Sequence, residues 1–112
     1  MNLTKRQTDN GGAIIELEGD ADLAAAPVFQ EAVEAVIADN PPFLVIDFSK
    51  STFVNTPIWA VVVQYYQHTT KENTGMAVSG LQGRVAASFG VVRLGEFIST
   101  YDSADEAIAA LS

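Results

Sequence analysis

The stretch Phe43–His68, FLVIDFSKSTFVNTPIWAVVVQYYQH, decides the fold. Its first six residues are nearly all apolar and follow two prolines, which predicts a strand covered on both faces and central in a sheet. A short polar link then leads to a helix start, with Thr56 predicted as the N-cap and Pro57 as the first helical residue. Residues 58–63 are too apolar for a solvated surface helix. We therefore expect a buried strand and helix whose junction lies at the surface.

The chain before this stretch predicts a β-hairpin, a loop and a helix. Two alternating segments, residues 3–8 and 13–18, flank Asn10-Gly11, a dipeptide typical of tight turns. Residues 19–23 are expected to form a loop. A helix is expected to begin at Pro27, because apolar residues then recur at three- and four-residue spacing. It should end before Asn40-Pro41-Pro42, because two prolines cannot continue a helix.

The chain after it predicts two further strands and two further helices. We expect strands at residues 76–79 and 97–101 and a short helix at residues 82–91. Ser103 and Glu106 have the spacing of a capping box, which predicts a C-terminal helix. Because strands and helices alternate after the hairpin, parallel strands with helical crossovers are expected. The predicted fold is α/β, a single domain over residues 1–112 with a mixed β-sheet of four to five strands and helices packed on it.

Composition excludes several classes of function. The net charge of −8 and the pI near 4.3 argue against a nucleic-acid partner, which needs clustered Lys and Arg. The absence of cysteine excludes disulfides and thiolate sites. No apolar run approaches the roughly 20 residues of a membrane span, and no apolar run follows Met1–Arg6 as a secretory signal would require. We expect a soluble, cytoplasmic protein without direct membrane insertion.

No set of residues points to catalysis, a cofactor or a metal. His68 is the only histidine, so no familiar zinc set is present, and no serine has a visible His–Asp arrangement. Asp20 and Asp22 could suggest a cation, but two acids without further oxygen ligands at defined spacing are weak support. The glycines at residues 80–83 lack the phosphate-loop lysine. The protein is not expected to be an enzyme.

Several motifs, taken in order, resemble those of a STAS domain, the fold of bacterial anti-sigma factor antagonists and of the cytoplasmic parts of sulfate transporters. Residues 19–23, with the later Pro27, resemble the family's acidic loop and first-helix start. Residues 44–49 resemble its central strand, and Thr52-Phe53-Val54-Asn55-Thr56 resembles the run that ends in its phosphorylated hydroxyl residue. Arg84-Val85, and residues 101–107, resemble the family's last helix, strand and helix. The resemblance covers almost the whole chain.

The resemblance implies a protein-interaction module whose partner is an anti-sigma factor or a related serine/threonine kinase of ATPase fold. Thr56 is the implied phosphorylation site. A phosphate there would add about −1.5 to −2 charges at a helix N-terminus, which the fold tolerates but a partner's surface need not. An exposed apolar patch around Ile58 is expected to mark the interface. The candidate partner-binding residues are Asp20, Asp22, Asn55, Thr56, Pro57 and Ile58.

Departures from the family pattern leave alternatives open. Asn55 stands where the family usually has Asp, Pro57 where it often has Ser or Thr, and Ile58 where glycine is common. One alternative is therefore an accessory subunit that is not phosphorylated, in a lipid-transport ATP-binding complex or a signalling scaffold. Another is a small-ligand binder or enzyme that uses the acidic loop and the helix N-terminus as a polar pocket. Thr56 could also act only as a helix cap.

Overall fold

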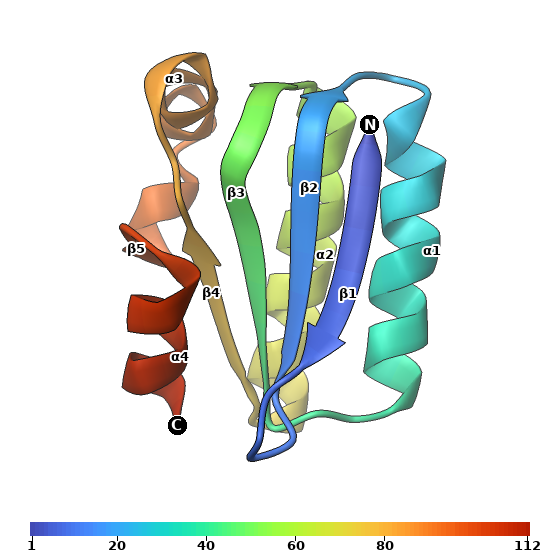
Figure 1. The fold of residues 1–112 in the computed structure, drawn as a ribbon, viewed down its shortest axis with the longest axis vertical. Helices are drawn as coiled ribbons and strands as arrows, with labels where there is room; N and C mark the ends of the chain where they lie inside the picture. The colour runs from blue at the N-terminus through green and yellow to red at the C-terminus, as the bar shows by residue number, and fades with distance from the viewer.

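Strand β3 is the central strand of a five-stranded sheet. The computed structural model describes all residues, 1–112. Strand β1 (Asn2–Gln7) pairs antiparallel with β2 (Ala13–Ala21), and β2, β3 (Phe43–Val54), β4 (Gly75–Ser79) and β5 (Ser99–Tyr101) follow as parallel neighbours (Figure 1). The predicted α/β class, a mixed sheet with helices packed on it, is confirmed.

Helices cover both faces of the sheet, which buries β3 on both sides. Helices α1 (Ala25–Ala38) and α2 (Thr56–Glu72) pack on one face and α4 (Ala104–Leu111) on the other, while α3 (Gly83–Val91) follows β4 (Figure 1). Because side chains alternate along a strand, Leu44 and Ile46 enter the large core with α1, α2 and α3. Phe43 and Val45 enter the smaller core under α4. The predicted double-sided burial of this strand is therefore confirmed.

Strands β2 and β3 are both longer than their apolar patterns indicate. The expected loop at residues 19–23 is confirmed only for Asp22 and Leu23, because β2 continues to Ala21. The expected polar link after Phe48 is also wrong, because β3 continues to Val54. The two extensions pair with each other through register shifts between Glu16 and Glu18 and between Gly19 and Asp20. Such bulges interrupt the alternation that identifies a strand in a sequence.

The predicted hairpin between β1 and β2 is confirmed. Its turn is closed by the Thr8 N–H, which donates to the Gly12 carbonyl at 2.8 Å. Gly11 has a φ of +87°, which a residue with a Cβ rarely adopts. Gly12 lies so close to the ring of Phe43 that an added Cβ would come within 2.1 Å of it. Both glycines are therefore required by this turn.

The C-terminal elements were predicted with one main error. The capping box is present, because Ser103 Oγ accepts from the Glu106 N–H at 3.2 Å. The Glu106 carboxylate accepts in return from the Asp102 N–H, one residue before the cap. The last strand is shorter than expected, Ser99–Tyr101, because a 3-10 turn (Leu94–Glu96) precedes it and Phe97 is exposed.

None of the helices is both long enough and apolar enough to cross a membrane.

Stability is expected to fall above pH 10 because Tyr65 of α2 is buried. The side chain is 2% exposed, and its burial raises the pKa of the phenol from 10.0 to about 12. Below pH 10 the phenol is neutral in both the folded and the unfolded protein. Above it the unfolded chain ionises first, so the free energy of unfolding should decrease by about 2–3 kcal/mol by about pH 12.

Urea unfolding of the wild type and of Tyr65→Phe at several pH values checks this expectation. The two proteins differ only at this side chain, so the difference between the two pH profiles isolates Tyr65. The variant should lose less stability over the alkaline range. Parallel profiles would contradict the buried state of the phenol.

Candidate functional site

Helix α2 begins one residue earlier than the sequence indicated. Asn55, not Thr56, is the N-cap, and its Oδ1 accepts from the Thr56 N–H at 2.8 Å. Thr56 is then the first helical residue and Pro57 the second. Asn is as good an N-cap as Thr, and a proline is tolerated anywhere in a first turn whose N–H groups lack helical partners. The predicted capping role of Thr56 is therefore wrong.

Because Asn55 caps the helix, the hydroxyl of Thr56 is not needed for this role. Its side chain is exposed, and the hydroxyl has no hydrogen-bond partner in the protein. The first turn of α2 contains no acidic residue. The positive end of the helix macrodipole therefore acts on this position without a negative side chain in that turn, a setting that favours an anion.

The end of β2 lies directly beside this helix start. The register pairs Ala21 with Val54, and the Asn55 N–H donates to the Ala21 carbonyl at 2.8 Å. Asp20 pairs with Phe53 in the register, and its carboxylate accepts a short hydrogen bond from the Thr52 hydroxyl. Asp20 is therefore a strand residue held against β3, and the structure brings it to the same end of the sheet as Thr56.

Asp22 organises the start of α1. Its Oδ1 accepts from the Ala25 N–H at 3.2 Å, and its carbonyl accepts from the same N–H at 3.0 Å. This turn lets α1 begin at Ala25, two residues before the expected start at Pro27. Asp22 itself is exposed, and Leu23 beside it is 67% exposed. The turn therefore presents an acid and an apolar side chain next to each other.

Two residues on β3 and α3 complete this end of the molecule. The Phe53 ring is 38% exposed, and the guanidinium carbon of Arg84 lies 6.0 Å from its centroid. Arg84 also donates to the Thr52 carbonyl at 3.4 Å. The run of residues 52–56 contains Phe53, but only the fold brings Arg84 to it from a distant helix.

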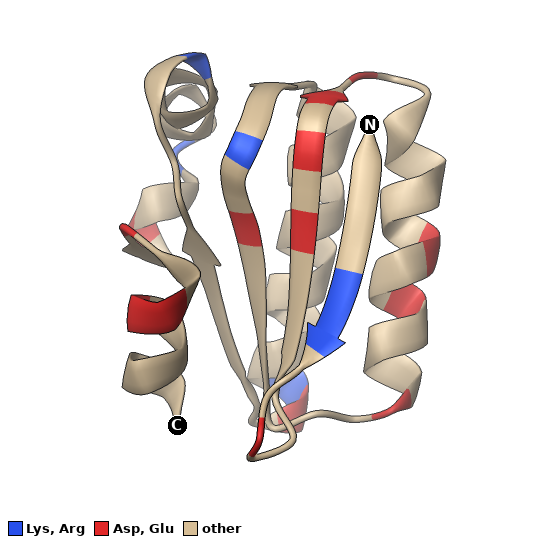
Figure 2. Cartoon of the chain, viewed as in Figure 1, with Lys and Arg blue, Asp and Glu red and all other residues tan.

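We call this end of the molecule the Thr56 surface. Its members are exposed or half-buried and lie where β2 and β3 end and α1, α2 and α3 begin (Figure 1). The Thr56 surface consists of Asp20, Asp22, Leu23, Phe53, Asn55, Thr56 and Arg84. Figure 2 shows acidic residues at the end of β2 and in the turn after it, with one basic residue on α3.

The expected apolar patch around Ile58 is wrong. Ile58 is fully buried, and Val61 and Tyr65 are buried with it. Apolar side chains follow two lines along α2. The line of Ile58, Val61, Val62 and Tyr65 is buried. In the second line Trp59 is buried against α3, while Val63 and Tyr66 are partly buried against the same core. Exposed apolar area at this end comes instead from Leu23 and Phe53.

The polar pocket expected for a small ligand does not coincide with the main cavities of the molecule. Both lie at the opposite end of the sheet, beside the turn between β1 and β2. No group of three or more His, Asp or Glu side chains is arranged to hold a metal ion.

Comparisons with solved structures agree on the fold. A crystal structure of an anti-sigma factor antagonist from Mycobacterium paratuberculosis superimposes with a TM-score of 0.91 and 27% identity, over 98% of this chain and 92% of that one. The phosphorylated form of the Bacillus cell fate determinant SpoIIAA shares the fold, with a TM-score of 0.78 and 13% identity over 99% of this chain and all of that one.

Sequence comparison gives a shorter match and a longer one. The anti-sigma-F factor antagonist RsfB of Mycobacterium tuberculosis is 43% identical over 47 residues, which are 42% of this chain and 38% of that protein. The aligned segment thus spans well under half of this relative. The model of the STAS domain family matches residues 2–107, nearly the whole chain. The chain therefore belongs to the STAS domain family.

Proposed function

We propose that this protein is an anti-sigma factor antagonist. It binds an anti-sigma factor, a kinase of ATPase fold, and thereby frees a sigma factor for transcription. The observation that carries this proposal is the similarity over 98% of the chain to an anti-sigma factor antagonist, at 27% identity. The protein acts in the cytoplasm by binding rather than by catalysis, and its partner is a protein rather than a nucleic acid.

The partner contacts the Thr56 surface in this proposal. Leu23 and Phe53 supply exposed apolar side chains, which at an interface contribute most when an uncharged surface covers them. Asp20 and Asp22 supply negative charge at its border, and Arg84 supplies one positive charge. The partner surface should therefore be apolar at its centre and basic where it meets the two aspartates.

Phosphorylation of Thr56 would switch this contact off. The hydroxyl is exposed and unpartnered, so a kinase can reach it without unfolding the helix start. A phosphate would add about −1.5 to −2 charges to a surface that already carries Asp20 and Asp22. The helix N-terminus stabilises that charge in the free protein, whereas the partner has to bury it. Phosphorylation therefore lowers the affinity for the partner and leaves the fold intact.

The direct test is a pull-down with the organism's own candidate anti-sigma kinases, with and without ATP. We expect one of them to bind without ATP and to release the protein when ATP is present. Intact mass should then rise by about 80 Da, the mass of one phosphate, in the wild type and not in Thr56→Ala. Failure of every candidate kinase to bind would refute the proposed function.

Binding without phosphate transfer would favour a different role within the family. In that role the protein is an accessory subunit of a larger assembly, such as a lipid-transport ATP-binding complex or a signalling scaffold. The observation that favours it is Asn55, which has the shape of the usual Asp without the charge. It predicts an unmodified Thr56 in protein isolated from cells and co-purification with an ATPase or scaffold subunit.

Phe53→Ala is expected to weaken partner binding by roughly 10- to 100-fold, the range for a central aromatic contact. The ring is 38% exposed and packs only partly on the protein, so the free energy of unfolding should fall by about 1 kcal/mol or less. Calorimetric titration with the anti-sigma factor measures the binding. Phe97→Ala is the matched control, because Phe97 is also exposed but lies outside the Thr56 surface. Equal effects of the two substitutions would contradict the assigned interface.

A further inference from the structure

The outer edge of β1 is open. β1 is an edge strand of the sheet and pairs only with β2. Along such an edge every second backbone N–H and C=O group points away from the neighbouring strand. An extended segment of another chain can satisfy these groups by adding to the sheet.

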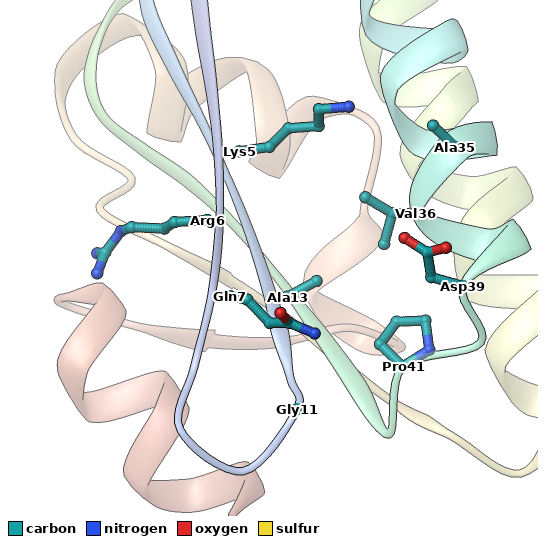
Figure 3. Close-up of a pocket in the computed structure, with 9 residues that line it drawn as sticks. All are labelled: Lys5, Arg6, Gln7, Gly11, Ala13, Ala35, Val36, Asp39 and Pro41. Carbon is teal, nitrogen blue, oxygen red and sulfur yellow. The ribbon is translucent and has the colours of Figure 1, made fainter.

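A groove accompanies this edge. It has a volume of about 320 Å³ and runs between β1 and the C-terminal half of α1 (Figure 3). Small apolar side chains and polar side chains share its walls. The residues on which the argument rests are Lys5, Gln7, Ala13, Val36, Asp39 and Pro41. The volume of the groove is large enough for a side chain of an added strand.

The edge carries local positive charge in an acidic protein. β1 contains Lys5 and Arg6 and no acidic residue, while the whole chain has a net charge of −8. Lys5 forms no ion pair and reaches toward α1, whereas Arg6 points to the other side of the sheet (Figure 3). On that side the Arg6 Nη2 atom lies 3.7 Å from the Glu16 Oε2 atom and forms an ion pair with it. One free ammonium group therefore faces the groove.

We propose that an extended acidic segment of another protein binds to the edge of β1. Two adjacent acidic residues of the segment lie opposite Lys5 and Arg6, one on each side of the sheet. The residue opposite Gln7 is apolar, and its side chain enters the groove over Ala13 and Val36. It is not acidic, because the α1 wall of the groove carries Asp39.

Other occupants fit the edge less well. In a second copy paired through the same edge, the Lys5 and Arg6 side chains of both copies would gather, and two chains of charge −8 would approach each other. A small molecule would remain largely exposed, whereas small-molecule sites bury most of their ligand. An acidic strand gains both the backbone hydrogen bonds and the ion pairs.

This second interaction surface is separate from the Thr56 surface. The groove lies where β1 ends and β2 begins, and the Thr56 surface lies where β2 and β3 end. The inference therefore holds whether or not the proposed function is right. A partner attached at β1 leaves the Thr56 surface free to bind its own partner.

The test uses two blocked hexapeptides and ¹⁵N-labelled protein. Acetyl-Thr-Val-Glu-Glu-Val-Thr-amide presents the same pattern whether it adds parallel or antiparallel, and the lysine counterpart acetyl-Thr-Val-Lys-Lys-Val-Thr-amide reverses its charge. On titration with the acidic peptide, amide shifts should change in β1 and along the groove. Lys5→Glu should weaken its binding at least about fivefold. Arg84→Glu, the same charge change on α3, should leave it unaltered.

A second variant tests the groove without a change of charge. Ala35→Phe places a ring on the exposed groove-facing wall of α1 and should also weaken binding of the acidic peptide. Equal binding of the two peptides, shifts outside β1 and the groove, or no shift at low millimolar peptide would overturn the proposal. So would a concentration-dependent dimer that protects the β1 amides, since the occupant would then be a second copy.

Discussion

Thr56→Glu is expected to weaken binding to the anti-sigma factor by at least about 100-fold while the protein stays folded. The substitution places a negative charge on the Thr56 surface, which already carries Asp20 and Asp22. A charge buried in an interface without a partner typically costs several kcal/mol of binding free energy. Calorimetric titration of the purified variant with the anti-sigma factor measures the loss.

The same substitution should not destabilise the free protein. Thr56 is the first residue of α2 and is exposed, and Glu is the better helix former. A negative charge at a helix N-terminus contributes about 0.3–1 kcal/mol of stability. The free energy of unfolding should therefore stay equal or rise slightly, as urea unfolding would show.

Two further substitutions separate charge from shape at this position. Thr56→Gln has nearly the size of the glutamate variant without its charge, so it should bind far better. Thr56→Ala should bind nearly as well as the wild type, because the hydroxyl makes no hydrogen bond within the protein. If the glutamine variant binds as weakly as the glutamate variant, size and not charge controls the contact.

Trp59→Ala is expected to lower the free energy of unfolding by about 3–5 kcal/mol. The side chain is 1% exposed, and its ring lies 5.0 Å from Phe48 and 5.4 Å from Phe89, measured between centroids. Its Nε1–H donates to Ser88 Oγ at 2.7 Å. It thus joins the sheet, α2 and α3. Since domains of this size are stable by only about 5–15 kcal/mol, the loss is a large part of the total.

Urea unfolding followed by far-ultraviolet circular dichroism measures this loss, because Trp59 is the only tryptophan and fluorescence would disappear with it. Trp59→Phe keeps most of the buried volume and removes the hydrogen bond, so it should cost less. Ser88→Ala removes only the acceptor and should cost about 1–3 kcal/mol, the range for a buried donor left unpaired. A loss below about 1 kcal/mol for Trp59→Ala would mean that this residue is not part of the core.

The elements with strong local patterns could be predicted from the sequence, and their exact ends could not. The apolar run from Phe43 identified the central strand, and Asn10-Gly11 identified the hairpin turn. The continuation of β3 to Val54 depends on pairing with the bulged end of β2, which no local pattern records. The cap of α2 is Asn55 and not Thr56, because both residue types can cap a helix and the sequence does not show at which of the two the helical dihedrals begin.

The burial of Ile58 could not be predicted from the spacing of apolar residues in α2. Helix α2 is apolar along two lines, and a sequence does not show which neighbours will cover the second line. The structure places α1 on one flank and α3 against Trp59, so the first line is buried and the second is buried or half-buried. The exposed apolar groups at this end come from Leu23 and Phe53. Arg84 belongs to the Thr56 surface only because α3 returns to the end of β3.

The departures from the family pattern have a structural explanation. Asn55 caps α2 with its side-chain oxygen, Pro57 occupies a first-turn position that needs no N–H partner, and Ile58 fills the core. All three residues thus support the helix start and leave the Thr56 hydroxyl exposed. They are compatible with a modifiable Thr56, which the mass measurement tests.

The central claim is that the partner, an anti-sigma factor, binds at the Thr56 surface. Titration of ¹⁵N-labelled protein with the unlabelled anti-sigma factor tests it most directly, because each backbone amide reports on its own surroundings. We expect the largest changes at Asp20–Leu23, Phe53–Thr56 and Arg84, and none along β1. Changes confined to other surfaces, or no binding, would contradict the claim.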